Sequence, residues 1–138
     1  MGFIATGKLS DFVKLETALL NADITTDRES TFRPAEGFTL YRAHLQTGTV
    51  AATKKATVQL LQAKDASGTG KKALTDPVEF TAGDGGEVAE ISVEAKQEDL
   101  DSNNGFTHIA VKVTCDNATA VVGAAVLELG GASYKPVG

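Results

Sequence analysis

The sequence holds few of the residues that mark several common protein classes. Its 138 residues include one cysteine, Cys115, no tryptophan, and only 6% aromatic residues. A single cysteine excludes an intrachain disulfide and a cysteine-based zinc site. So few aromatic rings disfavour a protein that stacks sugars or single-stranded nucleic acid. We therefore expect the chain to fold by burying its own apolar side chains, in a reducing compartment.

Long apolar runs and basic clusters are scarce as well. The longest apolar run, residues 120–127, is far shorter than the ~20 residues that span a bilayer. No charged segment followed by an apolar one opens the chain, so no secretory signal is expected. The net charge is −5, whereas a DNA-binding protein neutralises phosphates with a basic face. The expected partners thus include neither a membrane nor nucleic acid.

No group of residues indicates catalysis. The two histidines, His44 and His108, fall on predicted strand faces beside Arg or Lys, which is typical of surface or interface residues. A catalytic nucleophile needs a base within reach and a third group to orient that base, and no such motif is present. The segment 99–105 resembles a calcium loop, but Asn104 and Ala110 stand where an EF-hand has Gly and Glu. We predict no enzyme, no catalytic residue, no cofactor and no metal site.

Alternating apolar and polar residues predict strands from Phe38 onward. The expected strands are 38–46, 56–63, 78–81, 88–95, 107–113 and 120–129. Residues 47–54 are interpreted as a loop, and Gly, Asp and Asn cluster in turns at 65–70, at 82–86 and at Asn104-Gly105. Short strands separated by such turns predict an all-β fold, a single antiparallel β-sandwich or jelly-roll-like barrel with extended N- and C-terminal arms.

The same alternation predicts which faces are buried. Core positions are expected at Ala89, Ile91 and Val93, and again at Ile109, Val111 and Val113, with Glu90, Glu94 and Lys112 outside. Cys115 continues the second of these series, so its thiol is expected to be buried and unreactive. The last strand is apolar on both faces and should lie centrally or against a neighbouring subunit.

The first part of the chain allows two interpretations. Apolar residues between Leu9 and Leu20 could mark one face of a short helix with Ser10 as its N-cap, whereas residues 23–27 favour extended chain. We favour the extended form. The predicted organisation is an N-terminal arm and first extended segment over 1–36, a β-sandwich core over 37–130, and a C-terminal tail over 131–138.

The two ends of the chain carry the candidate partner contacts. Phe3 and Ile4 near one end, and Tyr134 and Val137 near the other, stand among small and flexible residues. Ordering such a tail costs about 1–2 kcal/mol per residue, which exceeds what two buried anchors return. We therefore expect the tails to be ordered only in an assembly, where the four side chains contact a partner.

Several segments resemble small structural proteins of tailed-bacteriophage virions. The resembling segments are 23–30, 37–38, 58–69, 106–113, 120–124 and 129–137. They form strands and turns and carry no chemistry, so no functional residue is transferred. The resemblance implies a capsid decoration or cement protein that binds the major capsid protein and associates with itself on the shell. It also implies location in the virion, after assembly in the bacterial host cytoplasm.

Two other roles stay open on the sequence. One is a phage tail or head-completion component. The other is a carbohydrate-binding β-sandwich module, which would need an exposed Tyr or Phe to stack on its ligand.

Overall fold

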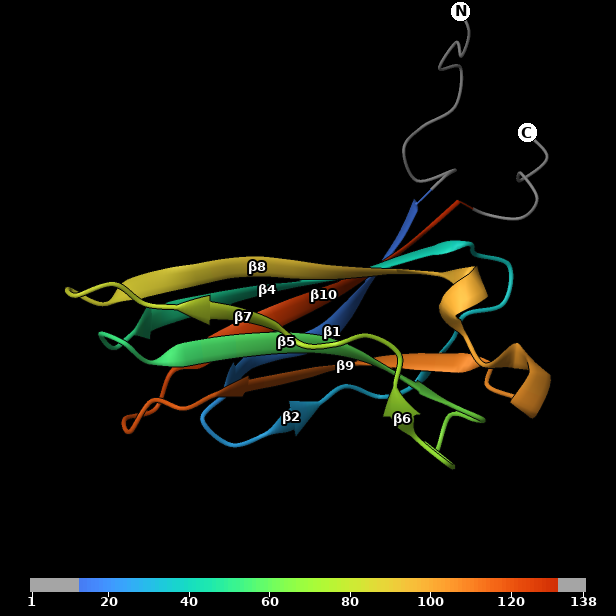
Figure 1. Cartoon of the computed structure of the whole chain (residues 1–138), viewed down its shortest axis with the longest axis horizontal. Helices are drawn as coiled ribbons and strands as arrows, with labels where there is room; N and C mark the ends of the chain where they lie inside the picture. The colour runs from blue at the N-terminus through green and yellow to red at the C-terminus, as the bar shows by residue number, and fades with distance from the viewer. Residues whose placement is uncertain (1–12, 132–138) are drawn as a thin grey trace, which may run out of the picture.

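The computed structural model describes residues 13–131, and in this range strands dominate (Figure 1). Two short 3-10 helices are present, η2 (Gln97–Asp99) and η3 (Ser102–Asn104). The strands are β1 (Val13–Asp23), β2 (Arg28–Glu29), β3 (Arg33–Pro34), β4 (Leu40–Val50), β5 (Lys55–Ala63), β6 (Lys72–Ala73), β7 (Val78–Thr81), β8 (Glu87–Lys96), β9 (His108–Cys115) and β10 (Val122–Gly130).

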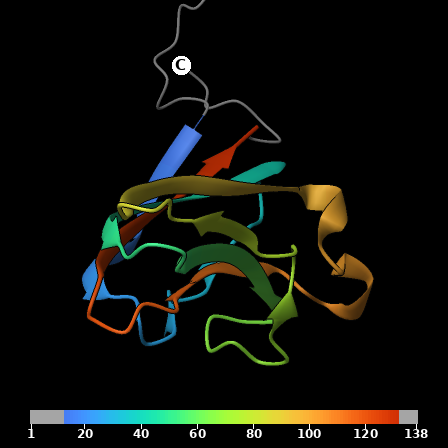
Figure 2. The same ribbon diagram turned by 60° about the vertical axis from the view of Figure 1, so that its left-hand side comes forward.

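These strands form two antiparallel sheets that pack face to face (Figures 1 and 2). Sheet A has the order β1-β10-β4-β8. Sheet B has the order β2-β9-β5-β6, with β3 also paired to β9 and β7 to β5. The chain passes from one sheet to the other at most connections, which is the connectivity of a jelly roll. The predicted β-sandwich is confirmed, and the two sheets do not close into a barrel.

The core lies between the sheets and follows the alternation of the sequence. Its largest fully buried side chains are Tyr41, Ile24, Leu45, Leu60, Ile109, Leu127, Leu129, Val50, Val58, Val111 and Val113. The core positions predicted on β8 and β9 are confirmed, although Ile91 is half-buried. Cys115 is a free, buried cysteine, as expected.

One local expectation needs correction, and one open alternative is decided. Residues 47–54 are not all loop, because β4 continues to Val50 through a register shift between Gln46 and Thr49. The Thr47 hydroxyl accepts a hydrogen bond from the Ala89 amide there, so β4 stays attached to β8 across the irregular stretch. In residues 13–23 the favoured extended form is confirmed and the helical alternative is wrong, since this segment is strand β1. The chain then enters the core with Ile24, so the extended segment expected within 1–36 belongs to the sandwich.

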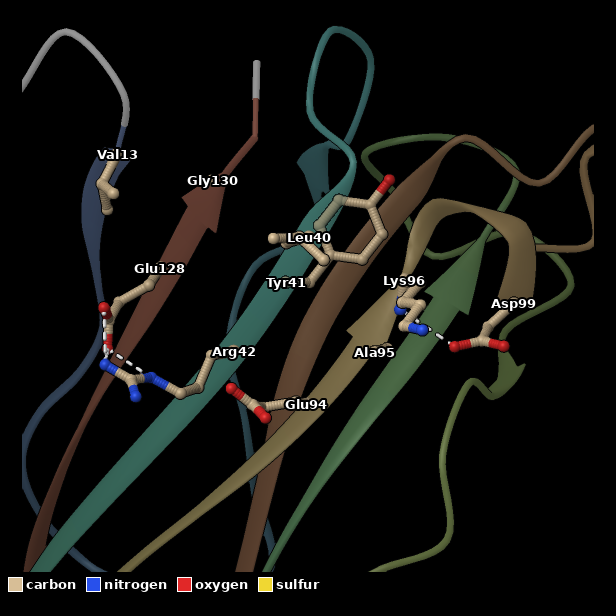
Figure 3. A pocket seen from close by; sticks show the side chains of 10 residues that line it. All are labelled: Val13, Leu40, Tyr41, Arg42, Glu94, Ala95, Lys96, Asp99, Glu128 and Gly130. Carbon is tan, nitrogen blue, oxygen red and sulfur yellow. Dashed lines mark hydrogen bonds and ion pairs between the residues drawn. The ribbon is translucent and has the colours of Figure 1, made fainter. Parts of the chain in front are cut away.

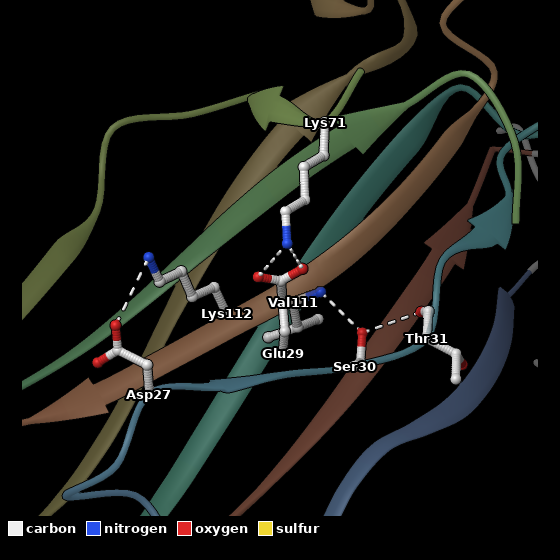
Figure 4. A network of polar contacts seen from close by, with 7 residues as sticks. All are labelled: Asp27, Glu29, Ser30, Thr31, Lys71, Val111 and Lys112. Atoms are coloured by element: carbon white, nitrogen blue, oxygen red, sulfur yellow. Dashed lines mark hydrogen bonds and ion pairs between the residues drawn. The ribbon is translucent and has the colours of Figure 1, made fainter. Parts of the chain in front are cut away.

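Sheet B carries a second, smaller core on its outer face. Phe32, between β2 and β3, covers Leu61, Ala63 and Ala110, and all four side chains are buried. Backbone and side-chain hydrogen bonds between Ser30 and Val111 hold this covering segment on β9 (Figure 4).

An ion pair adds to this attachment. The Lys71 ammonium contacts both carboxylate oxygens of Glu29 at 3.0 and 3.2 Å, which ties the 65–70 turn to β2. The apolar part of the outer face of sheet B, around Leu61 and Ala110, is thus covered by the chain itself.

Candidate interaction surface

The outer face of sheet A has no such cover among residues 13–131, and apolar side chains gather on it. The large hydrophobic side chains exposed in this range are Leu15, Leu20, Leu40, Val88, Val122 and Val126. All six lie on strands of sheet A. Each lies next to a residue that faces the core, so alternation directs it outward. We call the outward surface of these four strands the A face.

The strand register arranges the A face in rows. Leu15 on β1 pairs with Glu128 on β10, Glu128 with Arg42 on β4, and Arg42 with Glu94 on β8. The next row contains Thr17, Val126, His44 and Ser92. In these two rows the apolar side chains, Leu15 and Val126, lie on β1 and β10, and every side chain on β4 and β8 is polar.

Four residues form the apolar half of the A face, which we call the aliphatic patch: Leu15, Leu20, Val122 and Val126. Their exposed fractions are 65%, 78%, 53% and 36%. A monomeric protein normally leaves such side chains scattered over its surface, so four of them on two neighbouring strands of one sheet face mark a candidate contact surface.

Internal ion pairs occupy the polar half of the A face. The Arg42 guanidinium donates to both carboxylate oxygens of Glu128, at 2.8 and 2.9 Å. The His44 Nε2 lies 3.4 Å from Glu90 Oε1. Glu94 lies across from Arg42 and makes no ion pair with another described residue. The polar half is thus acidic towards β8.

A hollow of about 320 Å³ opens at one end of the A face, where β1 begins and β10 ends (Figure 3). Its lining includes Gly130, which has no side chain, and the apolar side chains of Val13 and Leu40. Three of its charged groups have partners: Arg42 holds Glu128, and the Asp99 carboxylate accepts a hydrogen bond from the Lys96 amide. The Glu94 carboxylate and the Lys96 ammonium also line the hollow, and neither makes an ion pair with another described residue.

Strand β1 is an edge strand, and its inward face carries charge. Lys14 and Glu16 pair with core-facing Leu129 and Leu127, so they point between the sheets. The carboxylate of Glu16 lies 2.9 Å from the Lys14 ammonium and 3.1 Å from Arg33 Nε on β3. Inward charges and the two register shifts in β1 are features that protect a sheet edge against strand addition. The A face, and not this edge, is therefore the open surface.

The residues chosen from the sequence fall in different places. Phe3, Ile4, Tyr134 and Val137 lie outside the described residues. His44 and His108 are half-buried on outer strand faces, as expected for surface residues, and the structure does not bring them into one site. Within 13–131, no three His, Cys, Asp or Glu side chains are grouped so as to hold a metal ion. The same range contains no helix long and apolar enough to cross a membrane.

The sequence does not reveal the aliphatic patch, because nothing in it shows that the two strands that carry the patch are neighbours. Leu20 belonged to an ambiguous segment that could have been a helix. The final strand was recognised as apolar on both faces, which was the one available signal for the patch. Only the pairing of β1 with β10 joins the two contributions.

No protein-family model matches the chain, and no curated protein matches its sequence. Similar solved structures include a chain of infectious bursal disease virus, Gx strain, with a TM-score of 0.50 and 13% identity over 89% of this chain and 33% of that chain. Another is the CBM22-1-GH10 part of Clostridium thermocellum xylanase 10B complexed with xylohexaose, with a TM-score of 0.50 and 10% identity over 93% of this chain and 30% of that chain.

A Bacillus endospore appendage, described as a disulfide-linked pilus, is also similar, with a TM-score of 0.43 and 12% identity over 96% of this chain and 98% of that chain. The chain spans about a third of the length of the viral and xylanase chains. At 13% and 10% identity, the likeness to the viral and xylanase chains shows a shared β-sandwich fold and no more.

Proposed function

We propose that the chain is a non-enzymatic structural protein of a bacteriophage virion, specifically a capsid decoration or cement protein. The observation that carries the proposal is the A face, where every large aliphatic side chain exposed within residues 13–131 lies on one sheet. A surface of this kind becomes stable in water when another protein subunit covers it. Jelly rolls are common in viral capsids, which is an analogy at the level of the fold.

The size of the aliphatic patch indicates weak contacts that are repeated many times. Fully burying a Leu or Val side chain contributes about 1.5–3 kcal/mol, so the exposed fractions of the patch amount to roughly 3–7 kcal/mol. Association itself costs an estimated 4–15 kcal/mol. One patch is therefore insufficient for tight attachment, whereas repeated copies on a shell act together.

The terminal segments supply the further contacts in this proposal. Val13 pairs with Gly130, so both terminal segments begin at the same end of sheet A. In the proposed arrangement they reach the major capsid protein, and Phe3, Ile4, Tyr134 and Val137 are the contacting side chains. Because the two terminal segments start from the same place, binding of one segment holds the other close to its own contact. This raises the effective concentration for the second contact.

A tail or head-completion component is the nearest alternative, because it would use the same surfaces. A carbohydrate-binding module has less support. Sugar binding uses exposed aromatic rings, and every aromatic side chain within 13–131 is buried or half-buried. Tyr41, beside the hollow, is only 2% exposed, and its hydroxyl donates to the Phe38 carbonyl.

The proposal is tested first on purified virions. Mass spectrometry of particles from the phage genome that encodes this chain should detect the protein, and electron microscopy should place it on the head. Placement on the tail or neck would replace the decoration role by the tail or head-completion role. Absence of the protein from the particles would overturn the proposal.

Co-sedimentation then tests the attachment. Full-length protein should sediment with empty shells of the major capsid protein from the same genome. The double variants Phe3→Ala/Ile4→Ala and Tyr134→Ala/Val137→Ala should each weaken binding at least about tenfold, which corresponds to ~1.4 kcal/mol. Ala5→Ser is the matched control, since it changes a small neighbour in the same segment. Failure of the full-length protein to bind shells would contradict the proposal.

A further inference from the structure

We infer that the aliphatic patch is the interface of a homodimer, and that its occupant is the same patch on a second copy of this chain. The inference rests on the proposed function only in taking the A face as an assembly surface, and it names the partner of that face. Its test needs no shell or other protein, so it can fail or succeed independently.

The patch is complementary to itself. Val126 pairs with Thr17 and lies at the centre of the patch. Leu15 pairs with Glu128, two residues to one side of Val126, and Leu19 pairs with Ala125, which places Leu20 about two residues to the other side. A two-fold axis through Val126, perpendicular to the strands and in the plane of the contact, therefore lays Leu15 of one copy on Leu20 of the other.

The charges confine the contact to β1 and β10. Under the same two-fold axis, the β8 strands of the two copies also face each other, and each carries exposed Glu90 and Glu94. Carboxylates facing each other would repel, so the sheets must diverge towards β8. Arg42 and Glu128 neutralise each other at the border of the patch. The polar half then stays in water, as in the rim of an interface.

The available area fits a weak dimer. Strands β1 and β10 contain 11 and 9 residues, so their paired length is about 30 Å at ~3.3 Å per residue. A surface about 15 Å wide over two strands and their flanks gives roughly 450 Å² per copy, or about 900 Å² in total. This lies just below the ~1,000 Å² of a specific, stable interface, which is the range of weak and transient contacts.

A second copy could alternatively add to the edge of β1 by strand pairing. The inward charges of Lys14 and Glu16 and the irregular register of β1 oppose this. Packing between faces leaves those charges where they are, on the inward side of β1. The two modes differ in which side chains meet, which makes them separable by crosslinking.

Self-association of the full chain is measured by sedimentation velocity from about 1 to 300 µM, the range in which a weak dimer dissociates. The wild type should show a monomer–dimer equilibrium that strengthens with added salt, because the net charge of each copy is −5 and salt screens the repulsion. Leu20→Glu should weaken dimerisation at least tenfold. Val88→Glu is the matched control: Val88 is 63% exposed on the far strand of the same sheet, and this variant should dimerise like the wild type.

Crosslinking tests the geometry. Val126→Cys should form an intermolecular disulfide with itself, and a mixture of Leu15→Cys and Leu20→Cys should crosslink faster than either protein alone. The native Cys115 is buried, so the wild type, which carries only this cysteine, measures the background crosslinking. A circular dichroism spectrum equal to that of the wild type establishes that each variant is folded.

The outcomes separate the two proposals. A dimer sensitive to Leu20→Glu but no binding to shells supports this inference and contradicts the proposed function. A wild type that stays monomeric over the whole range, or a dimer weakened equally by Val88→Glu, overturns the inference. If the wild type stays monomeric and Leu20→Glu also loses binding to shells, the partner of the aliphatic patch is the capsid protein.

Discussion

Gly123 on β10 offers a sharp test of how closely the chain packs beneath sheet A. Its backbone is in the ordinary range for a strand, so alanine there is not strained by conformation. A Cβ at this position would nevertheless lie 2.9 Å from Ile24 Cγ2 and 3.2 Å from Ile24 Cδ1. Ile24 is fully buried and cannot move into solvent. The substitution Gly123→Ala therefore sets a favourable backbone effect against a steric one.

The two effects differ in size. Replacing glycine by alanine inside a strand stabilises by roughly 0.5–1 kcal/mol through lower backbone entropy in the unfolded chain. Overpacking a core by one methyl group costs about 1–3 kcal/mol. The net result should be a loss of about 0.5–2 kcal/mol, or a fall in Tm of about 2–10 °C. Gly48→Ala on β4 is the control, because its Cβ would meet only the Val122 carbonyl oxygen, at 3.7 Å.

A double-mutant cycle isolates the steric term. Ile24→Ala removes both crowded atoms and should cost about 2–5 kcal/mol by itself. In that background Gly123→Ala should stabilise, so the coupling energy should be about 1–3 kcal/mol. If Ile24→Ala does not fold, Ile24→Val removes only the Cδ1 contact and should show partial coupling.

Urea unfolding followed by far-ultraviolet circular dichroism measures all four proteins of this cycle and the Gly48→Ala control. The reasoning is refuted if Gly123→Ala is at least as stable as Gly48→Ala. It is equally refuted if Ile24→Ala leaves the cost of Gly123→Ala unchanged.

Three other predictions concern acid stability, the thiol and a buried amide. Hydrogen bonds from the Thr25 hydroxyl and amide hold the pKa of Asp23 below its ordinary value of 3.8. The unfolded chain therefore binds more protons in acid, so the contribution of Asp23 to stability is fully present above the unfolded pKa and is lost as the pH falls through the folded pKa. Asp23→Asn should make the acid unfolding profile flatter, and an unchanged profile would contradict this. The Cys115 thiol, 5% exposed, should react with a thiol reagent only on unfolding, and rapid labelling of native protein would disprove its burial. Buried Gln62 donates a hydrogen bond to the Ala73 carbonyl and accepts one from the Asp101 amide. Gln62→Leu should therefore lower the free energy of unfolding in urea by about 1–3 kcal/mol, and a neutral result would show that water replaces both bonds.

The sequence alone determined the strands whose signal is local. The segment 88–95 alternates between small or β-branched apolar residues and polar ones, and the structure has strand Glu87–Lys96 there. This works because the two faces of a strand alternate at every residue whatever its neighbours are. The turn at Asn104-Gly105 was equally readable, since Gly105 adopts φ 86°, which favours glycine.

Only the tertiary structure decided which apolar faces are covered. The alternation around Leu61 and that around Val126 both indicate apolar side chains on an outer face. Phe32, about thirty residues before Leu61 in the chain, covers the first, whereas no described residue covers the second. Likewise, Leu20 lies in a strand and not in a helix because β1 pairs with β10, about a hundred residues later. A local pattern reports that a face is apolar, but burial depends on distant segments that the fold brings to it.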